Sequence, residues 1–440
     1  MKAGIITIID NNNYGNRLQN YAVQEYLKKK GIDVSTLKNI EDLNFRKNFI
    51  YRILKYIYRS TKHFLKKILK KEKEGFINRK KRFEEFNKNI NFYKRYVTAY
   101  SKVNSKFDYF ITGSDQVWNP SFFRLSDVDF LCFADPKKRI AFSASFGVSQ
   151  LPYENSKIPK KYLNDFRAIS VREDRGKEIV EELTNRNDVE VLLDPTMLLT
   201  AEDWDKVSKK PKQLKFSKYI LNYFLGEISE ERKKEINRIA KENECEIINI
   251  LDKNIPFYAT GPSEFLYLEK NAFLVCTDSF HSCVFAIIYN RPFIVFDREE
   301  KTVNMSSRIE TLLNKFELKN QKFSGKITEE NLKYNYEKAY KILENEKIKA
   351  NEFLSKALNI EWLEDDYTNE RKQRKKSRNY SFLFFINSNY HNPTNIYSIL
   401  NKNDGTKWIW FIFISVFCYW IFNRFGLRVW KCHNSLYNKI

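Results

Sequence analysis

The sequence of 440 residues predicts an α/β fold with two Rossmann-like domains that face a cleft. Two series of apolar, strand-length runs alternate with helical segments, which is typical of parallel sheets with crossover helices. The runs are almost wholly apolar, as expected for strands covered on both faces. A polar, lysine-rich stretch at 200–216, which contains Pro211, separates the two series. Because ligands of such sheets bind beyond the carboxyl ends of the strands, the loops at those ends are the candidate sites.

The first series defines an N-terminal domain over residues 1–205. It opens with a strand at 4–9, a polar loop at 10–16 and a helix at 17–30. The helix ends at Gly31, a residue suited to a helix C-cap. The later strands of this domain are predicted at residues 109–112, 139–143, 168–171 and 189–193.

The second series defines a C-terminal domain over residues 206–365. Apolar runs again alternate with charged segments of helical spacing. Strands are predicted at residues 219–224, 246–251, 273–277 and 293–296, and helices at 230–243, 263–270 and 282–289. This repeat of one pattern is the reason for expecting two similar halves.

Composition indicates a folded protein and argues against several kinds of site. Hydrophobic residues make up 42% of the chain, which is too many for a disordered protein. The formal net charge of +22 is largely local, since residues 46–95 hold 18 Lys/Arg and 4 Glu, and a second basic cluster lies at 371–378. No nucleic-acid motif accompanies this charge, so no nucleic-acid partner is expected. The six cysteines form no C-x-x-C pair, so neither a metal site nor a disulfide framework is predicted.

Two extensions accompany the predicted domains. A basic helical insertion is expected at about 45–96, and apolar residues within it follow helical spacing over 50–69. That helix either packs on the domain surface or rests on anionic lipid. A basic linker follows the C-terminal domain at 366–406.

A hydrophobic, aromatic-rich segment at 407–430 is a second candidate for membrane contact. Its core, WIWFIFISVFCYWIF at 408–422, is shorter than the roughly 20 residues of a full span. Its Trp and Phe residues, with Lys407, Arg424 and Arg428 beside them, suit insertion into the membrane or a position at its interface. A buried helix or an irregular tail is the alternative. Basic residues on both sides leave the orientation open.

Small and charged residues follow one strand of the first series. In FDYFITGSDQVWNP at 107–120, Gly113, Ser114 and Asp115 come directly after the predicted strand. Small residues let the backbone approach a ligand closely, and Asp115 offers a carboxylate at the mouth of the cleft. The alternative for Asp115 is a structural turn in which it caps a helix.

An arginine follows the next buried strand. Arg172, in ISVRED at 169–174, lies at a predicted sheet edge, where a forked guanidinium suits a carboxylate or a phosphate. An ion pair with Glu173 or Asp174 is the competing interpretation. By contrast, the tip formed by Asp194, Pro195 and Thr196 is predicted to be structural, since proline fixes the backbone there.

A histidine follows a strand of the second series. LVCTDSFHSCVFAII at 274–288 predicts a strand, a turn that ends at His281, and a helix from Ser282. Free backbone N–H groups at a helix start bind anions. His281, one of four histidines, therefore lies where a proton donor or acceptor is useful near neutral pH. A structural role for a single histidine is the alternative.

Together these segments resemble the polysaccharide pyruvyl transferase family. The motifs occur in family order over about residues 3–315. They are IITIIDNNNYGNRLQNYAVQEYL, ITGSDQVWNP, IAFSASFGVSQLP, ISVREDRG, VLLDPTMLL, FLVCTDSFHSCVFAIIYNRPFIVF and Ser307-Arg308-Ile309.

The resemblance implies a GT-B-like enzyme that takes a pyruvyl group from phosphoenolpyruvate and forms a ketal on sugar hydroxyls in cell-surface polysaccharide or capsule synthesis. The acceptor would be a sugar or a lipid-linked oligosaccharide, and no cofactor is needed. Separately from the resemblance, the scattered cysteines and the hydrophobic segment at 407–430 predict a cytoplasmic protein associated with the cytoplasmic face of the membrane. His281 would be the general acid or base, Arg172 would hold the donor, and Asp115 would orient donor or acceptor.

Many family members carry an arginine two residues before the histidine, where this chain has Ser279. Ser279 would then contact the donor, and a second cation would come from Arg298, Lys301 or Arg308. The loop residues expected near the cleft are Asn13, Tyr14, Gly15 and Ser114. Two other functions remain open: a GT-B glycosyltransferase that uses a nucleotide sugar, and a membrane-bound scaffold with a degenerate cleft.

Overall fold

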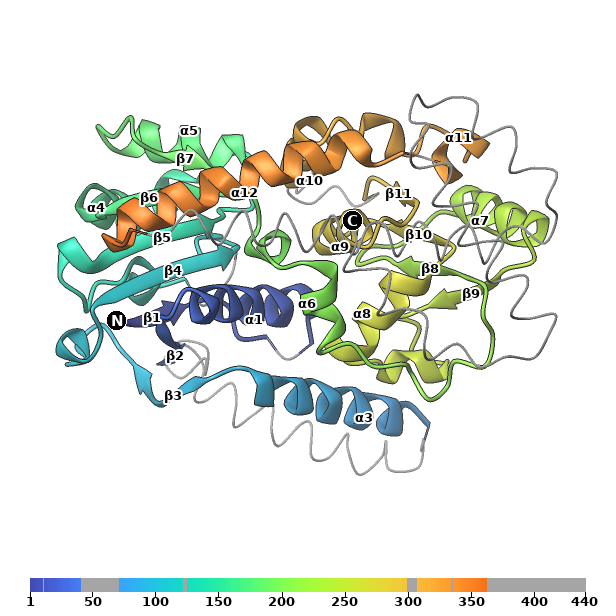
Figure 1. The fold of residues 1–440 in the computed structure, drawn as a ribbon, viewed down its shortest axis with the longest axis horizontal. Helices are drawn as coiled ribbons and strands as arrows, with labels where there is room; N and C mark the ends of the chain where they lie inside the picture. The colour runs from blue at the N-terminus through green and yellow to red at the C-terminus, as the bar shows by residue number, and fades with distance from the viewer. Residues whose placement is uncertain (11, 41–70, 122–124, 299–306, 334, 362–440) are drawn as a thin grey trace, which may run out of the picture. The chain divides into compact units, whose positions relative to one another are not determined.

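The computed structural model describes residues 1–10, 12–40, 71–121, 125–298, 307–333 and 335–361, all within one compact unit that spans Met1–Glu361 (Figure 1). The predicted helix at 50–69, the linker at 366–406 and the hydrophobic segment at 407–430 lie outside the described residues. Within the described part of the chain, no helix is long and apolar enough to cross a bilayer.

The first half of the chain builds a seven-stranded parallel sheet. Its spatial order is β3-β2-β1-β4-β5-β6-β7, so the order of the strands reverses beside β1. The strands are β1 Lys2–Ile6, β2 Asp33–Asn39, β3 Phe92–Val97, β4 Tyr109–Asp115, β5 Arg139–Ala144, β6 Ala168–Val171 and β7 Glu190–Val191. Parallel strands must be joined by crossover connections, which places all their carboxyl ends at one edge of the sheet.

The second half builds a four-stranded parallel sheet in the order β11-β10-β8-β9. The strands are β8 Tyr219–Tyr223, β9 Glu246–Asn249, β10 Leu274–Thr277 and β11 Phe293–Val295. The α/β class with two parallel sheets is therefore confirmed, because every predicted strand forms within a few residues of its expected bounds.

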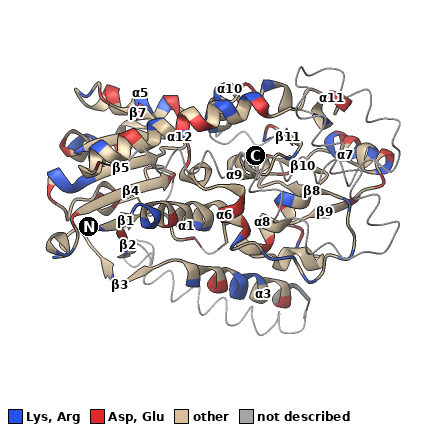
Figure 2. Cartoon of the chain, in the orientation of Figure 1, with Lys and Arg blue, Asp and Glu red and all other residues tan. Residues whose placement is uncertain are grey.

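Helices surround the two sheets, and Figure 2 shows acidic and basic residues mixed along them while the strands are largely uncharged. The α-helices are α1 Tyr14–Lys29, α3 Lys71–Phe86, α4 Lys157–Tyr162, α5 Asp174–Leu183, α6 Ala201–Asp205, α7 Glu230–Glu242, α8 Pro262–Asn271, α9 Phe280–Ile288, α10 Ser307–Lys315, α11 Glu329–Leu332 and α12 Glu337–Leu358. Two 3-10 turns are η8 at Pro195–Leu198 and η9 at Pro256–Ala259.

Two helices begin earlier than predicted, and both changes concern site residues. Helix α1 begins at Tyr14 because the Asn13 side chain accepts a hydrogen bond from the backbone N–H of Asn16 (3.3 Å), so the expected loop at 10–16 is cut short. Helix α9 begins at Phe280, which places His281 inside the first helical turn.

The expected helical insertion at 45–96 also differs. Residues 92–97 form strand β3, which pairs with β2 and extends the sheet. Before it, α3 packs on η9 of the second half, where Arg79 donates to the Tyr258 carbonyl (3.3 Å). The Arg79 guanidinium lies 4.5 Å from the centre of the Tyr14 ring and donates to the backbone oxygens of Asn12 (2.8 Å) and Thr260 (3.2 Å).

Helix α12, near the end of the described chain, runs back to the first sheet (Figure 1). Its Phe353 stacks on Phe142 of β5 at 6.3 Å between ring centres, and Arg167 donates to the Ala357 carbonyl (2.6 Å). The boundary at 205/206 stays a prediction, since this helix ties residues of the C-terminal series to the first sheet.

Candidate active site

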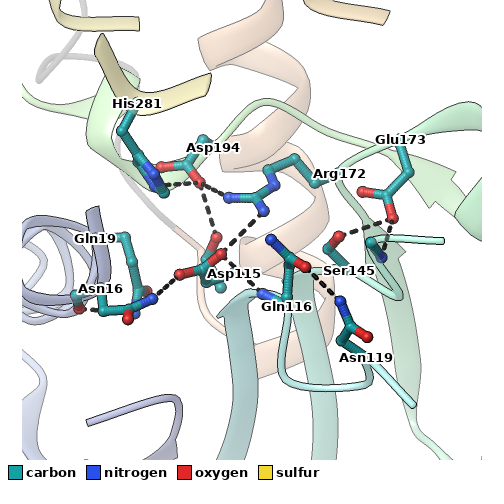
Figure 3. A network of polar contacts seen from close by, with 12 residues as sticks. Asn16, Gln19, Asp115, Gln116, Asn119, Ser145, Arg172, Glu173, Asp194 and His281 are labelled. Atoms are coloured by element: carbon teal, nitrogen blue, oxygen red, sulfur yellow. Dashed lines mark hydrogen bonds and ion pairs between the residues drawn. The ribbon is translucent and has the colours of Figure 1, made fainter. Parts of the chain in front are cut away.

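A buried polar network lies where the carboxyl edge of the first sheet meets α9 of the second half (Figure 3). It contains the three residues that the sequence predicted as a site: Asp115, Arg172 and His281. Asp115 ends β4, Arg172 follows β6, and His281 lies in the first turn of α9. All three are less than 10% exposed.

Asp194 joins these residues. Its Oδ2 atom accepts hydrogen bonds from Arg172 Nη1 (2.6 Å) and Ser114 Oγ (3.0 Å), while Oδ1 accepts from the backbone and hydroxyl of Thr196 (3.0 and 2.7 Å). The same Oδ2 lies 3.7 Å from Nε2 of His281. One carboxylate atom therefore faces a serine hydroxyl, a guanidinium and an imidazole.

Arg172 bridges two carboxylates, one with each arm of its guanidinium group. Its Nη1 binds Asp194, its Nη2 donates to Asp115 Oδ1 (3.1 Å), and its guanidinium lies 4.5 Å from the centre of the Phe280 ring. The side chain is only 1% exposed. The competing expectation, an ion pair with Glu173 or Asp174, is not what forms; both arms pair with residues far away in the sequence.

Asp115 is anchored from three directions. Besides Arg172, its carboxylate accepts hydrogen bonds from the backbone of Gln116 (2.9 Å) and from the side chain of Asn16 in α1. The Asp115 carboxylate is therefore held by Arg172, Gln116 and Asn16, whereas the alternative expectation was that it caps a helix.

His281 is placed against the backbone of α1. A Cβ atom added to Gly15 would lie 2.1 Å from His281 Nδ1 and 2.5 Å from Cε1, so the imidazole occupies the space that any other residue at position 15 would fill. Among the described residues, Nε2 has no hydrogen-bond partner and faces Asp194 at 3.7 Å.

The charges in the network favour ionised carboxylates. Burial raises the pKa of a carboxyl group, but His281 and Arg172 outweigh it and hold the pKa of Asp194 well below its usual range. Burial likewise opposes ionisation of Asp115, yet Arg172, His281 and Arg308 lower its pKa. The pKa of Arg172 is raised, since its two carboxylate partners outweigh its burial.

Arg308, at the start of α10, brings a second buried guanidinium to the site. Burial, together with the neighbouring charge of Arg172, lowers its pKa to about 10. With the Gln116 amide turned so that its oxygen faces the guanidinium, that oxygen accepts from Arg308 at 2.8 and 2.9 Å. Its guanidinium also lies 6.0 Å from the centre of the Phe280 ring.

The other predicted residues lie nearby or elsewhere. Ser279 is the buried N-cap residue of α9, and its backbone N–H donates to Thr277 Oγ1 (3.0 Å). Arg298 donates to Asp278 Oδ2 (3.0 Å), and Lys301 lies outside the described residues. Tyr14 is fully buried, its hydroxyl donates to the Thr260 carbonyl (3.0 Å), and burial raises its pKa to about 12, so it serves packing between the halves.

Sequence reasoning missed Asp194, which was expected to be structural, and it missed Asn16 and Phe280. The signal for Asp194 was present, because a carboxylate followed a predicted strand at the same edge as Asp115 and Arg172. Proline after it made a turn the simpler interpretation. Phe280 gave no signal of its own, since a phenylalanine before an apolar helix is usual in a core.

The arrangement suits proton transfer beside an anion. A carboxylate that faces an imidazole helps to fix the orientation of the ring. The first turn of α9 adds free backbone N–H groups and a partial positive charge. In the described residues, no group of His, Cys, Asp and Glu is arranged to hold a metal ion.

Comparisons with known proteins add a family. No curated protein sequence matches the chain. Solved structures that match include UDP-GlcNAc 2-epimerase of Methanocaldococcus jannaschii in complex with UDP-GlcNAc and UDP (15% identity, 78% of this chain and 99% of that chain, TM-score 0.36). They also include MurG of Acinetobacter baumannii (11%, 80% and 95%, 0.36) and a putative UDP-N-acetylglucosamine 2-epimerase of Listeria monocytogenes (11%, 82% and 91%, 0.41).

The sequence model of polysaccharide pyruvyl transferases matches residues 13–300. This match spans more than half of the 440 residues and contains Asp115, Arg172, Asp194 and His281. The chain therefore belongs to the polysaccharide pyruvyl transferase family and is a transferase enzyme.

Proposed function

We propose that the protein transfers the pyruvyl group of phosphoenolpyruvate to two hydroxyls of one sugar in a cell-surface polysaccharide precursor. The observation that carries this proposal is the His281–Asp194 pair, with a separation of 3.7 Å, in a site that also holds two buried arginines. Enol ester chemistry needs a proton donor beside an anion-binding site, and these groups supply both.

The reaction has two additions and one departure. The enol carbon C3 takes a proton, and a sugar hydroxyl adds to C2 as its own proton leaves. The C2–O bond to phosphate then breaks, and the second hydroxyl adds to the same carbon. Two protons leave the sugar hydroxyls: one matches the proton that converts the CH2 group of the donor to a methyl group, and the other leaves with the phosphate. No electrons are gained or lost, so no redox cofactor is needed.

His281 would act as the general acid and base in both additions. Its Nε2 atom would give a proton to C3 and take one from the attacking hydroxyl, while Asp194 stabilises the charged imidazolium between these steps. Such a group contributes typically 10²–10⁴-fold to the rate. Gly15 and Asp194 approach the ring from two directions and so set its orientation.

Donor binding would fall to Arg308, Arg298 and the first turn of α9. A guanidinium binds carboxylate and phosphate in the same forked geometry, and phosphoenolpyruvate carries both. Arg172 would act on the donor indirectly, because both of its arms already bind carboxylates.

The test uses the purified full chain, ¹⁴C-labelled phosphoenolpyruvate and lipid-linked glycan precursors from the source cells. The proposal requires phosphate release that depends on the acceptor, with label retained on the glycan. His281→Ala, checked for folding by thermal unfolding, should lower turnover by about 10²–10⁴-fold. Stabilisation by a nucleotide sugar without any effect of phosphoenolpyruvate would instead favour the glycosyltransferase alternative.

We also propose that the enzyme works at the cytoplasmic face of the membrane, held there by the segment at 407–430. The aromatic and basic composition of that segment supports this. A chain truncated after Asp404 should move from the membrane fraction to the soluble fraction. Unchanged fractionation would reject the segment as the anchor.

A further inference from the structure

A cavity of about 390 Å³ lies at the carboxyl ends of β8 and β9, against α7. It is lined by none of the residues that make up the His281 network. Its walls are apolar, with Phe224 and Ile228 among them, and several carboxamides lie between these side chains. A volume above 300 Å³ with mostly apolar walls and a few polar groups is typical of a small-molecule site.

Asn222 supplies the observation that points to a ligand. It is the register partner of Asn249, and its Nδ2 atom donates to Asn249 Oδ1 (2.8 Å). Its own Oδ1 is buried and has no hydrogen-bond partner among the described residues, although the residue is only 8% exposed and lines the cavity. Buried polar atoms are nearly always hydrogen-bonded, so this acceptor at the wall of the cavity is placed to accept a hydrogen bond from a ligand.

The chemistry of the walls matches a sugar. Carboxamides such as Asn222, Asn237 and Asn249 offer both donors and acceptors, as do sugar hydroxyls. The Phe224 ring offers a flat apolar surface to the C–H face of a pyranose ring, and Ile228 adds an aliphatic contact.

Charge argues against a phosphorylated ligand. Glu230 and Glu231 occupy the first turn of α7, where they offset the positive end of the helix. Lys233, the basic residue among the lining side chains, pairs with Glu230 at 2.6 Å, and Asp252 adds a carboxylate to the wall. A phosphate in the cavity would meet the Asp252 carboxylate, which would repel it, whereas an uncharged sugar would not be repelled.

Hydrogen bonds connect a loop at the cavity to the candidate active site. Between Phe224 and Ile228, the loop donates from the backbone of Leu225 (2.7 Å) and Gly226 (2.8 Å) to the carboxylate of Asp278. Asp278 precedes His281 by three residues in the same turn. A ligand in the cavity therefore contacts a loop that is hydrogen-bonded to the turn carrying His281.

We propose that this cavity is a carbohydrate subsite that binds an uncharged sugar unit through Asn222 and the Phe224 face. That this unit is part of the acceptor glycan rests on the proposed pyruvyl transfer. The subsite would recognise one sugar of the acceptor glycan while another sugar of the same glycan receives the pyruvyl group.

Direct binding tests the subsite without any turnover. Saturation-transfer NMR of the full chain would use the methyl glycosides of galactose, glucose and mannose, with uridine and UDP as competing probes. At least one glycoside should bind, and Asn222→Ala should weaken it by about tenfold through the lost hydrogen bonds. Asn314→Ala, at an exposed position of α10, is the matched control and should bind as the wild type does.

A second variant covers the case in which Asn222→Ala does not fold. Ile228→Trp fills the cavity with a bulkier side chain and should abolish glycoside binding. Binding that survives both changes, or uridine and UDP binding that depends on Asn222 in place of glycoside binding, would overturn the subsite.

Kinetics separate this proposal from the proposed function. With pyruvyl transfer established, Asn222→Ala should raise the KM for the glycan about tenfold and leave the KM for phosphoenolpyruvate unchanged. A rise in both constants, or in neither, would reject a role in acceptor binding. Glycoside binding that depends on Asn222 in a protein without pyruvyl transfer would reject the proposed function and retain the subsite.

Discussion

Replacing Gly15 by alanine should disable His281 while the rest of the fold stays in place. The new Cβ atom would lie 2.1 Å from Nδ1, 2.5 Å from Cε1 and 2.6 Å from Cγ of the imidazole. Cβ atoms do not approach other atoms so closely, so either the ring or the first turn of α1 must move. The ring is the more mobile of the two, because α1 is held by its cap and its packing.

Two opposite effects set the size of the result. Alanine is favoured over glycine inside a helix by roughly 0.5–1 kcal/mol, which offsets part of the strain in the free energy of unfolding. Displacement of a reacting group by about 1 Å costs about 10²-fold in rate. Gly15→Ala should therefore lower turnover about a hundredfold with a small change in melting temperature.

Under the proposed pyruvyl transfer, acceptor-dependent phosphate release measures the rate, and thermal unfolding measures stability. Gly75→Ala in α3 is the matched control, since a Cβ there would meet only the Tyr258 ring, at an ordinary 3.4 Å. This control should gain the helical stabilisation and keep full turnover.

A double-mutant cycle with His281→Ala separates the two effects. Once the imidazole is gone, Gly15→Ala should stabilise the protein by roughly 0.5–1 kcal/mol and cause no further loss of turnover. Full activity of Gly15→Ala in the wild-type background, or an equal effect of Gly15→Ala with and without the ring, would refute the argument that Gly15 positions His281.

Three further changes test the interior. Asp194→Asn should destabilise the protein by about 3 kcal/mol at pH 7, because the charge of Arg172 loses a buried partner; since the folded-state pKa of Asp194 is depressed, this difference in unfolding free energy should shrink as the pH falls below about 4. Burial raises the pKa of Glu269 from 4.5 to about 8, so its contribution to stability is lost as the pH rises through that range. Glu269→Gln should remove this dependence on pH. The unfolding free energy of the variant minus that of the wild type should be about 4 kcal/mol higher at pH 8 than at pH 4.5 in denaturant titrations. Arg79→Ala should lower the unfolding free energy by about 3 kcal/mol through the loss of its carbonyl contacts and its stacking on Tyr14, and a melting temperature equal to the wild type's would contradict that role.

Local patterns in the sequence were enough for the strands and for part of the site. The strand at 168–171 was predicted with the bounds it has, because its apolar run ends at a charged residue. Arg172 and Asp115 were identified for the same reason, since residues that follow parallel strands share one edge of the sheet. Their proximity is a consequence of topology, which the alternating pattern indicates.

Partners distant in the sequence were harder to predict. The pairing of Arg172 with Asp194 depends on the register of β6 and β7, and an adjacent acidic residue offered a simpler partner. Similarly, the polar run before α1 indicated a loop, because asparagine suits both loops and helix caps. The contact of Gly15 with His281 joins two halves of the chain and has no local signature.

His281 lies against Gly15 and Asp194, which belong to the other half of the chain. The imidazole is contributed by one sheet, and the surfaces that orient it are contributed by the other, so neither half contains a complete acid–base pair. Fragments separated within the stretch at 206–216 should each be inert, and activity should return with the square of fragment concentration under dilute conditions.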